Sequence, residues 1–387
     1  MGSAGVSRRL LLSAMVSLGL LPGLAARAAE PGAAIIITGT RPEKLLAELA
    51  ACRENCPPER RLELALAAGE ALFVAGDYRK ARAVVRDGLR RDGATVAPVQ
   101  PVLVAGTHRA LARINAHLGD GPAALRASYD IAGALKAGLL ADDPRIAYAS
   151  IEAADMLVKV GRINSAERAY APLARLPAPV GPVAELRLAW LAFIEGDVRL
   201  AQAKIATIAA SDDPALRPFR LPALVLAARI AADADRDAAV NAAIAEARMQ
   251  PATQKPVIVL DPPVQLAVNS ISEGEPGFLP VRTQASQSSG PNADGQWADV
   301  GLRIAPDGRV MDVAVLRSRG GNWWHPAVRA AIGARRYAPF ASADPEGAYR
   351  LERFTLTSWL EPTVGSRIER HSSQVRIERL DLTDKPQ

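Results

Sequence analysis

Aromatic residues, cysteines and histidines are all scarce in this chain. Phe, Trp and Tyr make up 4% of its 387 residues, and there are two cysteines and four histidines. No Walker loop or dinucleotide fingerprint occurs, no histidine pair has metal-ligand spacing, and no Gly-x-Ser-x-Gly nucleophile motif is present. We therefore expect a non-enzymatic protein without catalytic residues, metal or cofactor. We interpret His108, His117, His325 and His371 as solvent-exposed or helix-capping side chains.

The chain also lacks a strong charge of one sign. Its formal net charge is +6, but Arg8, Arg9 and Arg27 lie in the first 28 residues, which hold no acidic residue, so +3 remains for the rest. This excess is too small and too evenly spread for a nucleic-acid footprint. We expect no nucleic-acid partner.

The first 28 residues have the features of a secretory signal peptide. Arg8 and Arg9 precede an apolar run from Leu10 to Leu24, and Ala26-Arg27-Ala28 offers small residues at a cleavage site. The run is shorter than the roughly 20 residues of a membrane-spanning helix. We expect cleavage before Ala29 and a periplasmic location, of the Gram-negative type. The alternative is an uncleaved anchor, and only this alternative implies membrane association.

Cys52 and Cys56 are four residues apart, and Pro57 and Pro58 predict that a helix ends beside them. In an oxidising compartment this spacing favours a local disulfide. The loop that it closes is small, so we expect little stabilisation from it.

Residues 42–250 have helical periodicity and an internal repeat. Four glycine turns are each followed, five residues later, by an alanine: Gly76 and Ala81, Gly119 and Ala124, Gly161 and Ala166, Gly196 and Ala201. The glycines are 43, 42 and 35 residues apart, within the range of helical-hairpin solenoids. Glycine permits a left-handed helix end, and alanine permits close helix approach. A degenerate fifth copy places its turn at Asp233 to Asp237, with Ala239 as its alanine.

This region resembles the tetratricopeptide repeat family. The best copy runs from Leu64 to Leu89 and has small or apolar residues in the places that the family expects: Ala68, Leu72, Gly76, Tyr78 and Ala81. The periods are longer than the usual 34 residues. The resemblance therefore implies a tetratricopeptide-like solenoid without exact repeats.

The flanking regions have other patterns. Residues 29–41 include a strand-like piece, Ala33 to Thr38. Residues 251–295 are rich in proline, and the stretch from Gln284 to Gly290 consists of the linker-type residues Gln, Ser, Ala and Gly, so we interpret this region as a linker. It contains one candidate strand, Lys255 to Leu260. Residues 296–387 predict a small α+β domain with these elements: strands Trp297 to Ala305 and Arg309 to Leu316, helix Pro326 to Arg336, and strands Tyr349 to Leu360 and Val375 to Leu380. The fold class is thus multidomain, α followed by α+β.

Residues 297–361 resemble the C-terminal ββαβ domain of the TonB family of energy transducers. The resemblance rests on four segments in order: Asp307-Gly308-Arg309-Val310, the run from Val313 to Gly321, Ala327-Val328-Arg329-Ala330-Ala331, and Arg335-Arg336-Tyr337-Ala338-Pro339. It implies a sheet whose strand edge binds a peptide by strand addition, the partner being a TonB-box segment of an outer-membrane receptor.

The chain departs from true transducers, which retain an N-terminal membrane helix and a long Pro-rich spacer. We therefore expect a periplasmic adaptor that binds a protein or peptide partner, the alternative being an energy transducer for outer-membrane transport if the apolar N-terminal segment is retained. The candidate peptide-binding residues are Trp323, Trp324, Arg335, Arg336, Tyr337 and Arg353. For Trp323 and Trp324 a place in the core of the sheet is the other interpretation. For the arginines, including Arg317 and Arg319, the other interpretation is a solvated face.

Residues 35–41, Ile-Ile-Ile-Thr-Gly-Thr-Arg, resemble the start of many TonB-dependent receptors around their TonB box. An ordinary N-terminal strand is the alternative. If the box-like interpretation holds, the Ile35 to Thr38 strand is expected to pair with an edge of the C-terminal sheet and to compete with a receptor peptide.

Mass spectrometry of the exported protein tests the signal peptide. We expect a mature chain that begins at Ala29 and is found in the periplasm, because the apolar run is short and ends in a small-residue cleavage site. A chain in the inner membrane that still carries residues 1–28 would instead support the energy transducer.

Overall fold

A computed structural model gives the fold of the chain. It describes residues 41–52, 55–249, 256–266, 270–271, 295–342, 344–361 and 370–383. The predicted signal peptide, the expected strand from Ala33 to Thr38 and the Gln/Ser/Gly part of the linker lie outside the described residues.

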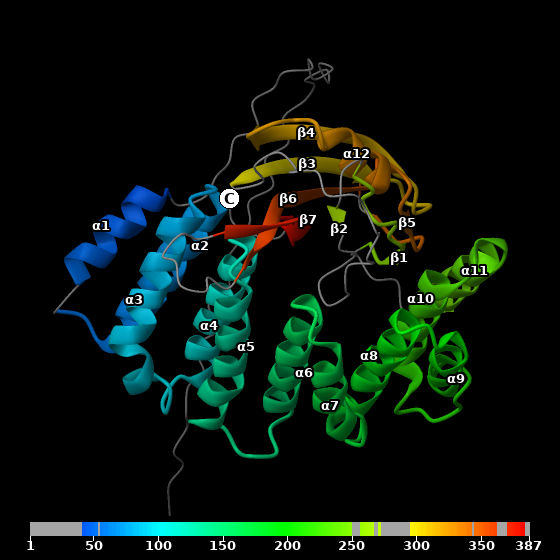
Figure 1. The fold of residues 1–387 in the computed structure, drawn as a ribbon, viewed down its shortest axis with the longest axis horizontal. Helices are drawn as coiled ribbons and strands as arrows, with labels where there is room; N and C mark the ends of the chain where they lie inside the picture. Colours follow the sequence, from blue (N-terminus) through cyan, green and yellow to red (C-terminus); the bar gives the residue numbers. More distant parts are fainter. Residues whose placement is uncertain are drawn as a thin grey trace, which may run out of the picture. The chain divides into compact units, whose positions relative to one another are not determined.

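The first large region is helical, and each of its helices from α1 to α11 contacts the next along the chain (Figure 1). The helices are α1 Pro42–Cys52, α2 Pro58–Val74, α3 Tyr78–Val96, α4 Pro101–His117, α5 Gly121–Lys136, α6 Pro144–Lys159, α7 Ile163–Ala174, α8 Val180–Ile194, α9 Val198–Ala209, the short 3-10 helix η1 Arg217–Phe219, α10 Arg220–Ile230 and α11 Asp233–Met249.

The four repeat glycines end α2, α4, α6 and α8 in the predicted left-handed conformation. Their φ angles are +85° at Gly76, +74° at Gly119, +79° at Gly161 and +94° at Gly196. At each turn the N–H after the glycine donates to a carbonyl five residues before it, at 2.8–2.9 Å. These bonds satisfy carbonyl groups that a helix end otherwise leaves unpaired.

The repeat alanines lie where helices meet. Ala81, Ala124, Ala166 and Ala201 are all fully buried. The prediction of a fifth turn at Asp233 to Asp237 is wrong, because Asp233 already begins α11 and the chain turns at Ala231 and Ala232. In that copy Ala243, rather than Ala239, is the fully buried alanine.

The C-terminal region is a five-stranded sheet with the order β2-β7-β6-β3-β4 and one helix. Its elements are β2 Ser270–Ile271, β3 Gln296–Ile304, β4 Val310–Arg319, α12 His325–Gly333, β6 Ala348–Glu361 and β7 Arg370–Asp381. All pairs are antiparallel except β2 with β7. The predicted strands are present, and β4, β6 and β7 are longer than expected. The chain is therefore α and α+β, as the composition and periodicity predict.

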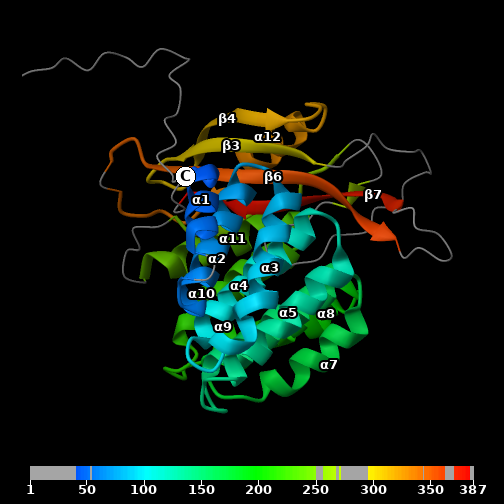
Figure 2. The ribbon, with the colours of Figure 1, turned by 90° about the vertical axis from the view of Figure 1, so that its left-hand side faces the viewer.

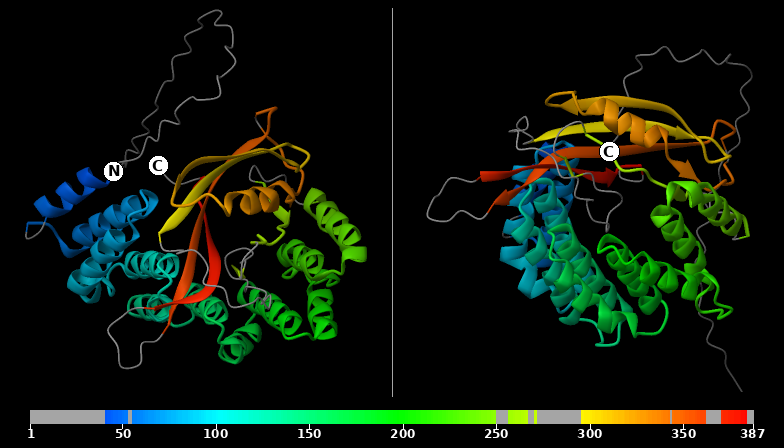
Figure 3. Two further views of the ribbon diagram at one scale, coloured as in Figure 1. Left: turned by 45° about the horizontal axis from the view of Figure 1, so that its top comes forward. Right: turned by 45° about the vertical axis from the view of Figure 1, so that its right-hand side comes forward.

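Successive residues of each strand point to opposite faces of the sheet. One face is apolar and packs under α12 (Figure 3), where Val300, Leu302 and Phe354 meet Val328 and Ile332 in a buried cluster. The helix face predicted from the sequence, Val328, Ala331 and Ile332, is confirmed as buried.

The opposite face of the sheet packs against the helices. Trp297 and Leu351 share a buried cluster with Leu72, Phe73 and Ile114, and Figures 1 and 2 both show the sheet beside α2 to α5. The N–H of Leu360 donates to the carbonyl of Gly119, 2.8 Å away, so a repeat turn directly holds β6. These contacts join the sheet directly to the helices.

Part of the segment that the sequence predicts as a linker forms a strand. Within it, strand β1, Ile258–Leu260, pairs with β5, Arg336–Tyr337, just after α12. Val259 and Val264 are buried, Val259 among residues of α10 and α11 and Val264 in the core of the sheet. The segment therefore contacts both regions.

Cys52 and Cys56 form a disulfide, with their Cα atoms 5.2 Å apart, and α1 ends at Cys52 as predicted. The Nη1 atom of Arg61 donates to the carbonyl of Cys56. Among the helices that the structure describes, none is both long and apolar enough to cross a bilayer.

Substituting Gly119→Ala tests the contact between the repeats and the sheet. A Cβ atom there would lie 2.0 Å from the carbonyl oxygen of Ser358, whereas at Gly161, with a similar φ, nothing lies within 4 Å. Both variants carry the backbone strain of about 1–3 kcal/mol, and Gly119→Ala adds an overpacking cost of about 1–3 kcal/mol. Urea unfolding should show the larger loss for Gly119→Ala. Equal losses in Gly119→Ala and Gly161→Ala would mean that the turn does not contact β6.

Candidate functional site

The face between sheet and helices is built from buried ion pairs, of which that of Arg353 is the most enclosed. Arg353 is fully buried, and its Nε and Nη2 atoms donate to Asp299 at 2.6 Å and 2.9 Å. Its Nη1 donates to the carbonyl of Phe73 at 2.9 Å. Burial lowers the pKa of Arg353, but Asp299 and Tyr78 together outweigh it and leave the pKa raised. The guanidinium therefore stays charged and joins β3 and β6 to the end of α2.

A second ion pair joins α6 to β7. The ammonium of Lys159 donates to Glu378 at 2.8 Å, and Arg376 also donates to that carboxylate. Burial raises the pKa of Glu378, but Arg376 and Lys159 outweigh it, so the pKa lies below its ordinary value. The carboxylate is thus held ionised between the two regions.

A third cluster joins the segment after β1 to the sheet. Arg335 donates to Asp261 at 2.6 Å and to Glu352 at 2.7 Å, and Arg379 donates to Asp261 at 2.7 Å. Burial raises the pKa of Asp261, but the arginines around it leave it lowered. A buried charge of this kind needs a partner of opposite sign, so these residues act as structural ties.

A neutral polar chain completes this face. The hydroxyl of Thr355 lies 2.8 Å from Nδ1 of His117 and 2.9 Å from the hydroxyl of Tyr78. Burial lowers the pKa of His117 to about 3, so its ring is neutral at neutral pH. The expectation of exposed or capping histidines is therefore wrong for His117. It is also wrong for His325, because both side chains are buried.

The structure does not bring the six predicted peptide-binding residues to one surface. Four of them are buried: Trp324, Arg335, Tyr337 and Arg353. Trp324 belongs to the core under α12 and donates from Nε1 to the carbonyl of Gly321 at 3.0 Å. Arg335 and Arg353 are engaged in the ion pairs above. Only Trp323, which is half-buried, and Arg336, which is exposed, reach the surface.

β4 is an outer strand of this sheet, and no other described strand pairs with its outer edge (Figure 1). The other outer edge belongs to β7, where the two-residue strand β2 covers only Val375 and Arg376. The pairing of β3 with β4 is irregular at two places, and Asp312 has a φ of +51° there. Such bulges and charges at an edge prevent indiscriminate strand pairing. They leave short stretches of β4 open to a partner.

A groove of about 430 Å³ runs beside this edge, between β4 and α12. Val313 and Val315 supply apolar surface on one side, and Pro326 and Arg329 line the other. His325 also lines the groove, and its Nε2 atom is buried without a hydrogen-bond partner among the described residues. Burial lowers the pKa of His325, so its ring is neutral at neutral pH. The arrangement can therefore accept an extended chain that supplies a partner for Nε2.

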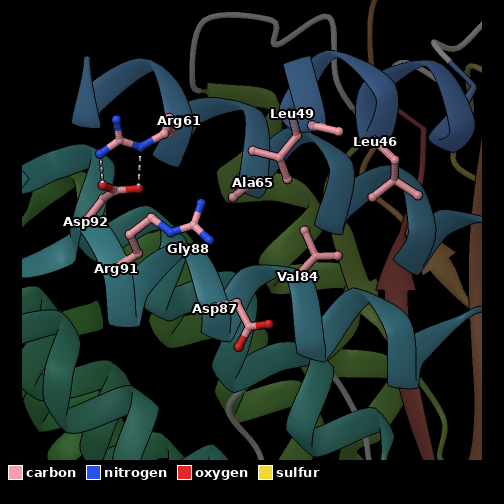
Figure 4. A pocket seen from close by; sticks show the side chains of 10 residues that line it. Leu46, Leu49, Arg61, Ala65, Val84, Asp87, Gly88, Arg91 and Asp92 are labelled. Carbon is pink, nitrogen blue, oxygen red and sulfur yellow. Dashed lines mark hydrogen bonds and ion pairs between the residues drawn. The ribbon is translucent and has the colours of Figure 1, made fainter. Parts of the chain in front are cut away.

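A further hollow, of about 250 Å³, lies under α1 (Figure 4). Leu46 and Leu49 of α1 form one wall, and the ion pair of Arg61 with Asp92 forms another. The ion pair and its bond to Cys56 give this hollow a structural role in holding α1 to α2 and α3. It has no arrangement suited to chemistry.

The described residues contain no cluster of three or more His, Cys, Asp or Glu side chains that could hold a metal ion. No protein-family model matches the chain, and no curated protein matches it. Among solved structures, the chain is similar to the crystal structure of BtubC (BKLC) from P. vanneervenii, with 16% identity and a TM-score of 0.39 over 56% of this chain and 96% of that one. A similarity this low carries no argument about function.

The substitution Arg353→Met tests whether the buried ion pair of Arg353 stabilises the packing of the sheet on the helices. Asp299 would keep its ion pair with the half-buried Arg317 but lose both hydrogen bonds from Arg353, and breaking a buried pair costs up to about 3–5 kcal/mol. The matched control is Arg109→Met, which removes the ion pair of Arg109 with Glu152. The two side chains are 48% and 39% accessible, and an exposed pair of this kind contributes less than about 1 kcal/mol to stability. Urea unfolding at neutral pH measures both. Similar losses would show that the Arg353 pair does not hold the sheet to the helices.

His117 predicts a loss of stability in mild acid. Its pKa is about 3 in the folded protein, against 6.5 ordinarily, so the unfolded chain takes up the proton first as the pH falls. This contribution is complete above pH 6.5 and declines towards pH 3, by roughly 2 kcal/mol at about pH 5. In His117→Gln this part of the decline should vanish from urea unfolding curves between about pH 7 and pH 5. An unchanged pH dependence would contradict the assignment.

Proposed function

We propose that the protein is a non-enzymatic periplasmic adaptor that binds an extended peptide along the outer edge of β4. One observation carries the proposal: this edge has no described neighbour and lies beside the groove that contains the unpartnered Nε2 of His325. In strand addition, backbone hydrogen bonds supply affinity, and alternate side chains enter such a groove.

The resemblance to the TonB family supports this choice of partner. The order β3, β4, α12, β6 follows the hairpin, helix and strand of that family's C-terminal domain. Because the groove with His325 lies beside β4, whereas β2 occupies part of the outer edge of β7, we place the peptide at β4. TonB-box segments of outer-membrane receptors are the proposed class of partner.

The helices are proposed to act as a tetratricopeptide-like scaffold for this sheet. The repeated glycine turns and buried alanines support that assignment. Their role in the adaptor is to hold the polar face of the sheet, which leaves α12 and the β4 edge on the other side available.

The edge favours a short partner segment. Because β4 is irregular at two places, only short stretches can form regular ladder bonds, and side chains in the groove must supply the remaining affinity. Val313, Val315 and Pro326 favour β-branched or other apolar side chains there. A neutral His325 can accept or donate one hydrogen bond.

Calorimetry with a synthetic Ile-Ile-Ile-Thr-Gly-Thr-Arg peptide tests the proposal on the full mature protein and on the same protein without residues 33–41, because the chain's own copy of this sequence is expected to compete. We expect saturable binding that is lost when alternate backbone nitrogens of the peptide are methylated, because methylation removes the ladder donors. Pro326→Trp fills the groove and should weaken binding about tenfold or more. Ala330→Trp, at another exposed position of α12 that does not line the groove, is the control and should bind normally.

Hydrogen exchange locates the peptide independently. Strand addition should slow the exchange of amides in β4 and leave those of β7 unchanged. The absence of saturable binding, or equal binding by Pro326→Trp and Ala330→Trp, would overturn the proposal.

A further inference from the structure

A second cavity lies on the opposite side of the sheet, where it meets the helices. It has a volume of about 400 Å³ and is lined by the start of α3, the end of α4 and the ends of β4, β6 and β7. We call it the arginine pocket, because Arg79, Arg82 and Arg319 all line it. Its volume is at the small end of the roughly 300–1,000 Å³ of small-molecule sites.

The guanidinium groups of this pocket are poorly neutralised by the protein. The side chains of Arg79 and Arg319 are exposed, and neither guanidinium has an ion pair or hydrogen bond with another described residue. Arg82 makes only a long contact, 3.4 Å, with Asp120. Three positive charges therefore line a hollow that has one carboxylate in its lining, Asp77, and a second carboxylate, Asp120, beside Arg82. The excess of positive charge favours an anion in the pocket.

The nearby carboxylates already have another role. Asp77, which also lines the pocket, accepts from the backbone N–H of Lys80 at 3.2 Å, and Asp120 accepts from that of Ala123 at 3.0 Å. These bonds cap the starts of α3 and α5. The capping carboxylates are thus committed to helix ends, where they satisfy otherwise unpaired donors.

The uncharged part of the lining is mixed, because it contains Leu118 and Leu360 beside several polar side chains. Tyr78 and His117 point into the network around Thr355, and Thr357 is a further hydroxyl in the wall. Such groups can bond the uncharged part of a ligand while the arginines hold its charge. Planar guanidinium groups are well suited to carboxylate and phosphate oxygens, since they donate two hydrogen bonds side by side.

We propose that the arginine pocket binds a small organic anion whose carboxylate or phosphate group is held by Arg79, Arg82 and Arg319. Arg79 and Arg82 come from α3, whereas Arg319 is the last residue of β4. Binding therefore requires the sheet to be docked on the helices and adds to the forces that keep it there. The inference is independent of peptide binding at the β4–α12 groove.

Calorimetry on the full mature protein tests the pocket. The probes are succinate for the carboxylate class and glycerol 3-phosphate for the phosphate class, with glycerol as the neutral control at matched ionic strength. We expect at least one of the two anions to bind saturably and glycerol not to bind. Whichever anion binds identifies the class, and binding by both means that the pocket selects charge alone.

Two variants and a control locate the bound anion. Arg79→Gln and Arg319→Gln should each weaken binding about tenfold, because a hydrogen bond to a charged group contributes at least that factor. Arg199→Gln removes an exposed arginine of α9 far from the lining residues and should leave the affinity within about twofold. All three positions are exposed, so unchanged melting temperatures are expected without ligand.

Absence of saturable binding by both anions would overturn the inference. An affinity of Arg319→Gln equal to that of Arg199→Gln would do the same, because it would place the anion elsewhere. Neither result would bear on the peptide experiment, which uses other residues.

Discussion

The hydrogen bonds of Arg353 are the constraint on which the arrangement of this protein depends. One guanidinium binds a carboxylate of β3 and a backbone carbonyl at the end of α2. A buried charge is stable only while its partners are in place, so the sheet and the helices fix each other's position. The clusters of Glu378 and Asp261 repeat this principle along the same face. The β4 edge lies on a sheet whose position is determined in this way.

This constraint explains why both faces of β6 are buried. Along β6, Phe354 and Leu356 face the core under α12, while Arg353, Thr355 and Thr357 face the helices, and all five are buried. An alternation of apolar and polar residues ordinarily indicates a sheet with one wet face. Here the polar face is covered by helices that supply matching charges and hydrogen bonds. The anion proposed for the arginine pocket would supply a matching negative charge to the arginines at the margin of this polar face.

Local signals in the sequence predicted the elements well. The glycine turns, the alanines at helix contacts, the hairpin at Asp307-Gly308 and the buried side of α12 depend on residues close together in the chain, so spacing and conformational preference suffice. The docking did not follow from such signals, because Phe73 and Arg353 are 280 residues apart. The solvated face expected for arginines such as Arg335 is likewise a local interpretation, and nothing in the spacing of the charged residues indicates Lys159 or His117 as partners of the sheet. For the same reason Arg335, Tyr337 and Arg353 were assigned to a surface that they do not reach.

The mixed character of this face affects how the chain is made. Synthesis proceeds from the N-terminus, so the helices exist before the sheet that covers them. During that interval the uncovered helices present Tyr78, His117 and Lys159 together with apolar residues such as Phe73 and Ile114. An uncovered surface of this mixed composition retains bound water and aggregates less readily with other incomplete chains than a purely apolar surface does. The polar side chains that later bond to the sheet thus also make the half-made protein less prone to associate with other chains.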